Sequence, residues 1–353
     1  MSQFTPLPAG RISHWHATVS EPALRALDEQ LLLDLLVIEE DDARRRDVAA
    51  IVADYLRSAD TDTAHRFELR CRDLGVEAIV ATDTAFGQVS KEPKAASVDS
   101  TPRPAPRESP TGPATGTTDV RQRYSRAIAG AETAWQGAAA NGMPDLATAF
   151  SAVDDLVASL QQDRQAILAL TETEEAADDT FTHMVNVSVL TIDQARTLEI
   201  DGQLLRDVGL AALLHDIGKV LTPKEILDKP ERLTPAEFEI MQRHTIEGAK
   251  ILRRTPGMPA LAPIVAFEHH LRLDGSGYPA AARREQLNLG TMICSIADVY
   301  DAMRSQRAYQ PAYPADQILA VLRRGRRPQF DPDLVQRFFE LLDIHPPGRL
   351  ASR

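Results

Sequence analysis

The sequence predicts a mainly α-helical protein in which residues 121–353 form an all-α bundle. Two observations predict this fold class. Apolar residues after position 121 recur three or four positions apart, which is the spacing of one face of an α-helix. The same half of the chain contains no convincing run of alternating apolar and polar residues, the pattern typical of a strand. This half is long enough to bury a substantial bundle core.

Helical periodicity also places the individual helices. One apolar stripe is formed by Leu146, Phe150, Val153, Leu156, Val157 and Leu160. Further helices are expected over 185–198, 204–214, 235–252, 259–270 and 288–303. Thr234 is a good N-cap and Pro235 suits the first helical position, which marks the start of the third of these. An alanine-rich helix over about 119–142 either forms a dimer seam or packs inside its own chain.

The preceding part of the chain divides in two. Residues 91–120 carry six prolines among Ser, Thr, Ala and Gly, and hardly any large apolar residue. Such a segment cannot bury enough surface to offset its ordering entropy, so we expect a flexible linker. Residues 1–90 combine helical spacing between 21 and 60 with strand-like runs at 67–71 and 76–81. They predict a small α+β module with a regulatory or interaction role.

Length, net charge and composition exclude several classes of protein. The chain has 353 residues, enough for two or three domains, and a net charge of -12, which argues against nucleic-acid binding by phosphate neutralisation. Cys71 and Cys294 are far apart and imply no disulfide framework. The first ten residues lack the pattern of a signal peptide, and no apolar run is long enough to span a membrane. We therefore expect a cytoplasmic protein.

A set of histidines and aspartates is distributed over the expected helices. Five of the nine histidines belong to it, and its members are His183, His215, Asp216, His244, His269, His270 and Asp298. Helix bundles build metal sites in this way, with one or two ligands from each of several helices. Imidazole and carboxylate suit Fe, Mn, Zn or Ni, and the lack of a neighbouring cysteine disfavours structural zinc. Because Asp216 can bridge, two metals are favoured, as in phosphoryl-transfer sites.

A single histidine on a helix is more often a surface or core residue than a ligand, so the conjunction of motifs matters. His215-Asp216-Ile217-Gly218-Lys219 is followed by His269-His270 and then by Asp274-Gly275-Ser276-Gly277-Tyr278-Pro279. This order resembles the HD-GYP branch of the HD-domain phosphohydrolases, over about residues 180–346. The resemblance implies an HD-type helical bundle and hydrolysis of cyclic di-GMP to pGpG, often onward to GMP. It also implies two or three divalent metal ions, commonly iron or manganese.

The resemblance assigns roles to individual residues. The seven histidines and aspartates match family metal ligands, and Asp216 with Lys219 is expected to be catalytic. Lys219 and Arg307 match residues that lie near the substrate phosphate. Gly277, Tyr278 and Pro279 match the loop that shapes the substrate entrance, where glycine permits unusual backbone angles and proline stiffens the chain.

The sequence departs from the family pattern at three positions. Asp179 stands where family members with three metals have glutamate, so it either binds a third metal or caps the helix that carries His183. Leu271 and Pro311 replace residues that are often glutamate and a basic residue, respectively. These two changes remove polar groups from the neighbourhood of the site but leave all seven expected metal ligands in place.

We therefore expect a metal-dependent cyclic di-GMP phosphodiesterase of bacterial signalling. One alternative is a catalytically weak receptor that binds a cyclic dinucleotide and signals through protein contacts. Another is a phosphodiesterase for a different cyclic dinucleotide, such as a hybrid one. The expected partners are cyclic di-GMP and, through residues 1–90, a diguanylate cyclase or another signalling protein. A homodimer is a further alternative.

Overall fold

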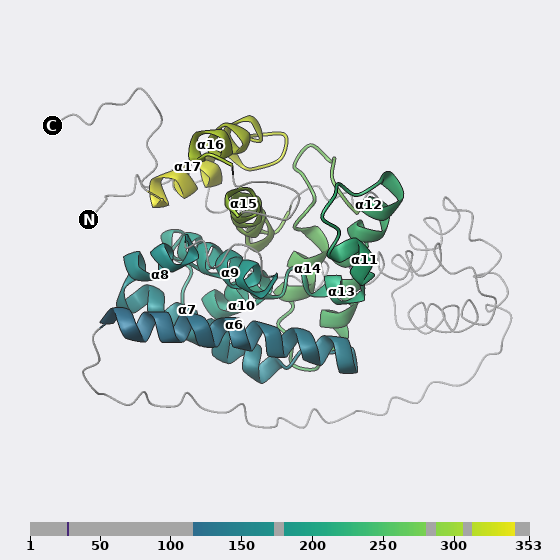
Figure 1. Ribbon diagram of the computed structural model, residues 1–353. Helices are drawn as coiled ribbons and strands as arrows, with labels where there is room; N and C mark the ends of the chain where they lie inside the picture. The colour runs from purple at the N-terminus through teal and green to yellow at the C-terminus, as the bar shows by residue number, and fades with distance from the viewer. Residues whose placement is uncertain (1–26, 28–115, 173–179, 280–286, 306–312, 343–353) are drawn as a thin grey trace, which may run out of the picture. The chain divides into compact units, whose positions relative to one another are not determined.

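A computed structural model describes Leu27 and residues 116–172, 180–279, 287–305 and 313–342. Within these residues the regular elements are helices, and the only β pairing consists of two isolated bridges (Figure 1). The mainly α fold class is therefore confirmed. The expected module at 1–90, and the expected site residues Asp179 and Arg307, lie outside the described residues.

The first helices form one side of the bundle. Helix α6 (Gly116–Asn141) packs along α7 (Leu146–Gln162), and α8 (Arg164–Thr171) follows (Figure 1). Helix α6 begins inside the range expected for the linker, so residues 116–120 are helical. Its alanine face is buried within this chain, through Ala127, Ala131, Ala134 and Ala138. The face proposed as a dimer seam therefore serves intrachain packing.

Helix α9 (Thr180–Thr197) is the centre of the fold. Every residue from Met184 to Ala195 is buried, because α6 and α7 pack on one side and α15 (Leu289–Arg304) and α17 (Pro332–Leu341) on the other (Figure 1). Helix α10 (Gly202–Leu213) crosses α9 closely, and the Ser188 hydroxyl donates to the Gly209 carbonyl at 2.9 Å. Because it is covered on all sides, α9 buries polar residues as well as apolar ones, among them Asn186, Thr191 and Asp193.

The helix expected over 235–252 is two helices, so that prediction was wrong. Helix α12 (Pro235–Gln242) ends before Arg243, and α13 (His244–Arg254) begins after it. Both have apolar residues at helical spacing, but their environments differ. None of the eight described residues of α12 is buried, whereas most of α13 is buried against α14 (Leu261–Glu268) and the short 3-10 helix η2 (Ile217–Leu221).

Several short elements were not predicted. They are α8, η2, α11 (Lys224–Leu227), α16 (Ala315–Arg324) and α17. The C-terminal pair packs on the bundle through buried Leu322, Phe338 and Phe339. Arg164 also joins distant segments, because its guanidinium binds Asp193 at 2.8 Å and the Leu341 carbonyl at 2.6 Å. Among the described residues, none of the helices has the length and apolarity to cross a bilayer.

Candidate metal centre

The seven expected ligands lie on five structural elements. His183 is in the first turn of α9, and Asp298 lies within α15. His215 and Asp216 occupy the turn between α10 and η2. His269 is the C-cap of α14 and His270 follows it. His244 lies in a helix as expected, and it is the first residue of α13 because the expected helix over 235–252 is interrupted at Arg243. Its backbone therefore lies at a helix start, beside η2.

These side chains converge into two groups with metal-ligand chemistry. One group contains Asp216, His244, His269 and His270, and the other contains His183, His215 and Asp298. Within each group the candidate ligand atoms lie within 4.8 Å of one another. All seven residues singled out from the sequence are thus brought together, although they are distributed over 116 positions of the chain, from His183 to Asp298.

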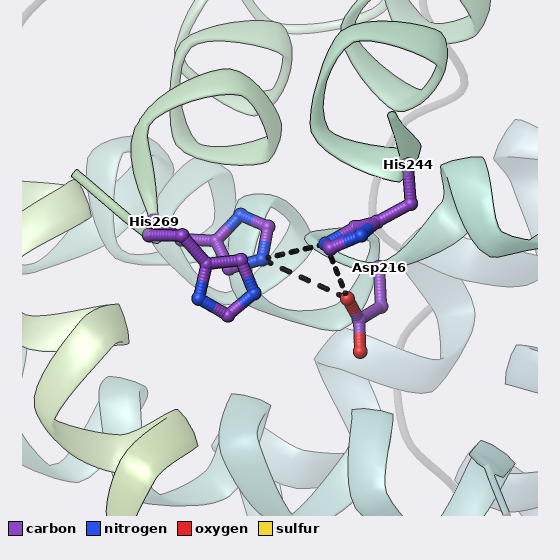
Figure 2. A group of neighbouring side chains, drawn as sticks. Asp216, His244 and His269 are labelled. Carbon is purple, nitrogen blue, oxygen red and sulfur yellow. Dashed lines mark hydrogen bonds and ion pairs between the residues drawn. The ribbon is translucent and has the colours of Figure 1, made fainter. Parts of the chain in front are cut away.

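Asp216 connects the two groups, because its two carboxylate oxygens face different partners. Oδ1 lies 3.3 Å from His244 Nε2 and 3.7 Å from His269 Nε2. Figure 2 shows this carboxylate pointing toward the two imidazoles. Oδ2 lies 3.3 Å from His215 Nε2 and 3.8 Å from His183 Nε2. Each oxygen of one buried carboxylate is therefore available to a different ligand group.

Hydrogen bonds on the other ring nitrogen orient the histidines. Nδ1 of His215 donates to the Ala212 carbonyl at 2.7 Å, and Nδ1 of His244 donates to the Met241 carbonyl at 2.7 Å. His269 Nδ1 lies 3.0 Å from the Ala266 carbonyl. Since a carbonyl only accepts, each Nδ1 carries a proton, and Nε2 is the nitrogen that faces the site. This arrangement is the one that metal-binding histidines need.

The unpaired atoms of the site fit a bound cation. His215 Nε2 and Asp216 Oδ1 are buried without a hydrogen-bond partner among the described residues. His244 Nε2 and His269 Nε2 lie 3.3 Å apart, and with both protons on Nδ1 their lone pairs face each other. Buried acceptors directed at one another are unfavourable unless a positive ion lies between them. The imidazole and carboxylate donors suit divalent transition metals.

The electrostatics of the site favour the deprotonated forms of His244, Asp216 and Asp298. Burial lowers the pKa of His244 to about 3, so this imidazole is neutral. Burial opposes the charge of Asp216, but Lys219 and His215 outweigh it and hold the pKa of this carboxyl well below its usual value. Asp298 is likewise lowered, because its hydrogen bond to His183 outweighs burial. These groups are therefore ready to coordinate without losing a proton at neutral pH.

Lys219 lies at the edge of the centre as the sequence predicts. Its ammonium group contacts Asp216 Oδ2 and the side chain is 19% exposed, so it reaches both the carboxylate and solvent. Its position depends on close backbone packing between η2 and α13. A methyl group at Gly218 would overlap the His244 carbonyl oxygen and the Gly248 amide. Only glycine allows this approach.

The loop after His270 forms one wall of the site. Leu271 and Gly277 make an antiparallel bridge, and the Ser276 amide donates to Asp274 Oδ1 at 2.9 Å. Gly277 has φ +96°, and a side chain there would overlap the His270 carbonyl. This turn brings the Tyr278 ring to 4.5 Å from the His270 ring, while Pro279 is half-buried. Leu271 itself is buried in the core.

One residue that contacts the site was not assigned a role from the sequence. Asp301 is fully buried and its Oδ2 accepts from His183 Nδ1 at 2.7 Å, while Arg304 binds its Oδ1. Asp301 thus orients His183 as the carbonyls orient His215, His244 and His269. It lies three residues after Asp298 on α15, so the one-turn spacing was the signal that could have identified it.

Comparison with known proteins agrees with this geometry. The family model described as HD domain matches residues 157–334, about half of the chain. The chain belongs to the HD domain family. The HD-GYP motifs expected from the sequence lie within this match, and the resemblance to that branch is confirmed. HD domain proteins of this type bind divalent metals, in agreement with the two ligand groups.

Individual relatives carry more specific names. A cyclic di-GMP phosphodiesterase of Pseudomonas aeruginosa is 36% identical over 227 residues, which are 64% of this chain and 55% of the relative. A 3'3'-cGAMP-specific phosphodiesterase of Vibrio cholerae is 35% identical over 164 residues, covering 46% and 35% of the two chains. The HD-GYP protein therefore spans about half or less of these curated relatives.

A solved structure supports the fold. A Bdellovibrio bacteriovorus protein described as an HDG"Y"P protein superposes with a TM-score of 0.52 at 18% identity, over 65% of this chain and 73% of that one. At this identity the likeness concerns the arrangement of the helices alone.

Proposed function

We propose that this HD-GYP protein is a metal-dependent phosphodiesterase that hydrolyses cyclic di-GMP to pGpG, GMP or both. The observation that carries the proposal is the placement of Asp216, whose two oxygens face separate ligand groups. A bridging carboxylate between two metal ions is suited to in-line displacement at a phosphodiester. Relatives named cyclic di-GMP phosphodiesterases support the choice of substrate.

The ligand groups define the proposed metal positions. Asp216, His244, His269 and His270 would hold one ion, and His183, His215, Asp298 and the second oxygen of Asp216 the other. Mixed imidazole and carboxylate donors suit iron or manganese. Asp179 as the ligand of a third ion also belongs to this proposal. When bound, the ions would supply positive charge to the phosphate and a water of lowered pKa.

The protein groups do the positioning. The buried Asp216 carboxylate stays ionised, so it could bind the metal ions without first losing a proton. The Lys219 ammonium contacts the same carboxylate at the edge of the centre. In that position it can neutralise charge that develops on the phosphate. Arg307, from the adjoining segment of the sequence, is proposed to do the same. Tyr278, with Gly277 and Pro279, borders the substrate entrance beside His270.

A second substrate has a specific observation in its favour. A relative named a 3'3'-cGAMP-specific phosphodiesterase matches this chain at 35% identity, as does a cyclic di-GMP phosphodiesterase of Thermotoga maritima. The two substrates differ in one base and share the same phosphodiester linkages. The metal centre therefore suits both, and discrimination must come from residues that contact the bases.

The substrate assignment is tested by comparing the two cyclic dinucleotides directly. Protein purified without oxygen and loaded with manganese or iron is assayed for kcat/KM on each, with products separated by chromatography. We expect cyclic di-GMP to be the better substrate, with pGpG or GMP as product. A larger kcat/KM for 3'3'-cGAMP would assign the second function. Tight binding of cyclic di-GMP without turnover would identify a receptor and contradict the proposal.

The cellular location and the protein partners of the enzyme are part of the same proposal. We infer that it acts in the cytoplasm, and that residues 1–90 connect it to a diguanylate cyclase, another signalling protein or a second copy of the chain. A pull-down with the full-length protein and with a chain lacking residues 1–90 tests this connection. Identical partners for the two proteins would contradict a role for that segment.

A further inference from the structure

Helix α12 is held in place by polar contacts at its start. Thr234 and Glu237 form a capping box, in which the Thr234 amide donates to Glu237 Oε2 at 2.7 Å. Lys229 binds the same carboxylate at 2.7 Å. None of the eight described residues of α12 is buried, so core packing does not explain its apolar residues. Phe238, with 45% of its surface exposed, therefore calls for another explanation.

The Phe238 ring continues a chain of aromatic contacts that starts at the metal centre. The Tyr278 ring lies 4.5 Å from His270 and 6.1 Å from His244, between centroids. The Phe238 ring lies 5.9 Å from Tyr278 and meets it edge to face, at 85°. Figure 1 shows α12 beside α11 and α13, whose first residue is His244. The half-exposed Phe238 ring is thus in contact with Tyr278, which in turn contacts the candidate ligands His270 and His244.

We propose that Phe238 is the stacking platform for a guanine base of the substrate, an inference that rests on the proposed function. A nucleotide whose phosphate lies at the metal centre carries a flat base one ribose away, and only the Tyr278 ring stands between the Phe238 and His270 rings in this series of contacts. Bases stack on exposed aromatic rings that stand next to a phosphate-binding site. The edge-to-face contact with Tyr278 fixes the ring while leaving much of its surface exposed.

Two other roles for Phe238 make different predictions. The ring could serve only to support Tyr278, in which case its loss would disturb the loop and the neighbouring His270. Alternatively, the apolar side of α12 could dock a protein, in which case Ile240, 38% exposed on the same helix, would matter as much as Phe238. The contact with Tyr278 favours the base-stacking role. It connects Phe238, which lies on a helix without any of the expected ligands, to the metal centre.

The test separates binding of the base from binding at the metals. Manganese-loaded wild type, Phe238→Ala, Phe238→Trp and the matched control Ile240→Ala are compared for KM and kcat with cyclic di-GMP. Inhibition by inorganic phosphate serves as a base-free probe of the metal centre. We expect Phe238→Ala to raise KM by about tenfold or more, as the loss of a stacked base should. The phosphate inhibition constant should stay unchanged, and Phe238→Trp and Ile240→Ala should behave as wild type.

Each other outcome overturns the inference in a recognisable way. An unchanged KM in Phe238→Ala excludes the stacking site while the phosphodiesterase activity stands. A phosphate inhibition constant that rises together with KM identifies Phe238 as a support of the loop. Equal losses in Phe238→Ala and Ile240→Ala show that the helix as a whole, and not the Phe238 ring, affects substrate binding. A wild-type protein with no turnover of cyclic di-GMP contradicts the proposed function and, with it, this site.

Discussion

Gly218 lies so close to His244 that a methyl group on its α-carbon would overlap the His244 carbonyl oxygen. The contact fixes η2 against α13, and so sets Asp216 and Lys219 relative to His244. We predict that Gly218→Ala separates these segments. The free energy of unfolding should fall by about 3 kcal/mol, as for overpacked cores, and bound metal should be lost. Elemental analysis and thermal unfolding of the purified variant measure both.

Gly142→Ala is the control for this substitution. Gly142 has φ +70° and its position has open space around it, so alanine there should reduce stability by about 1 kcal/mol without steric overlap. We expect this variant to keep its metal and its turnover. If Gly218→Ala kept them equally, the close approach would not matter for the site.

Lys219 is predicted to act on the substrate and not on metal retention. Its ammonium contacts Asp216 Oδ2 at the edge of the centre, and the ligand nitrogens are held by other groups. Replacing it with alanine should lower kcat by about 100-fold, the loss typical of a group that stabilises transition-state charge. Metal content should equal that of wild type. Lys224→Ala is the matched control, because Lys224 is 87% exposed and pairs only loosely with Asp228, at 3.9 Å.

Metal uptake should release a proton from His183. Burial opposes its charge, but hydrogen bonds to Asp298 and Asp301 outweigh burial and raise its pKa to about 9 in the metal-free site. A pKa raised above 6.5 stabilises the metal-free fold below pH 6.5, and this contribution is lost as pH rises through about 9. A metal must displace that proton. Manganese affinity should therefore rise about tenfold from pH 7 to pH 8. Calorimetry in two buffers of different ionisation enthalpy counts the protons, and release of none would contradict the prediction.

The Arg164–Asp193 pair is predicted to stabilise the fold without taking part in the chemistry. Arg164 joins a buried carboxylate on α9 to the carbonyl of Leu341 at the end of α17. Arg164→Ala leaves Asp193, whose side chain is 3% exposed, with only Arg196 nearby, at 3.9 Å, and should reduce stability by about 3 kcal/mol. Arg206→Ala removes a comparable pair with Asp154, whose side chains are 36% and 51% exposed, and should cost less than about 1 kcal/mol. Denaturant unfolding ranks the two variants, and equal losses would contradict the argument.

Much of the fold could be predicted because it depends on local pattern. The stripe from Leu146 to Leu160 lies within α7, and Asn288 caps α15 at the expected start. The break at Arg243 could not be predicted, since both flanking segments have helical spacing and only the packing of α13 against α14 and η2 distinguishes them. Short helices such as α8 and α11 carry too few residues for a periodic signal.

In the site, too, the residue types could be predicted from local pattern, whereas the contacts made by folding could not. The seven candidate ligands could be found because histidine and aspartate at those spacings are chemically unusual, and the structure gathers all of them. The division of Asp216 between two groups depends on which way each oxygen points, which no pattern of residue types records. Asp301 and Phe238 act through contacts made by folding, with His183 and Tyr278 respectively. Their residue types are ordinary for helices.

The central claim is that the centre built around Asp216 hydrolyses cyclic di-GMP. The most direct test is the rate of cyclic di-GMP consumption by manganese-loaded wild type and Asp216→Ala, followed by chromatography of the products. The account predicts turnover to pGpG or GMP by wild type that is abolished by chelation and by Asp216→Ala. Equal rates for the two proteins, or turnover that survives complete removal of metal, would contradict it.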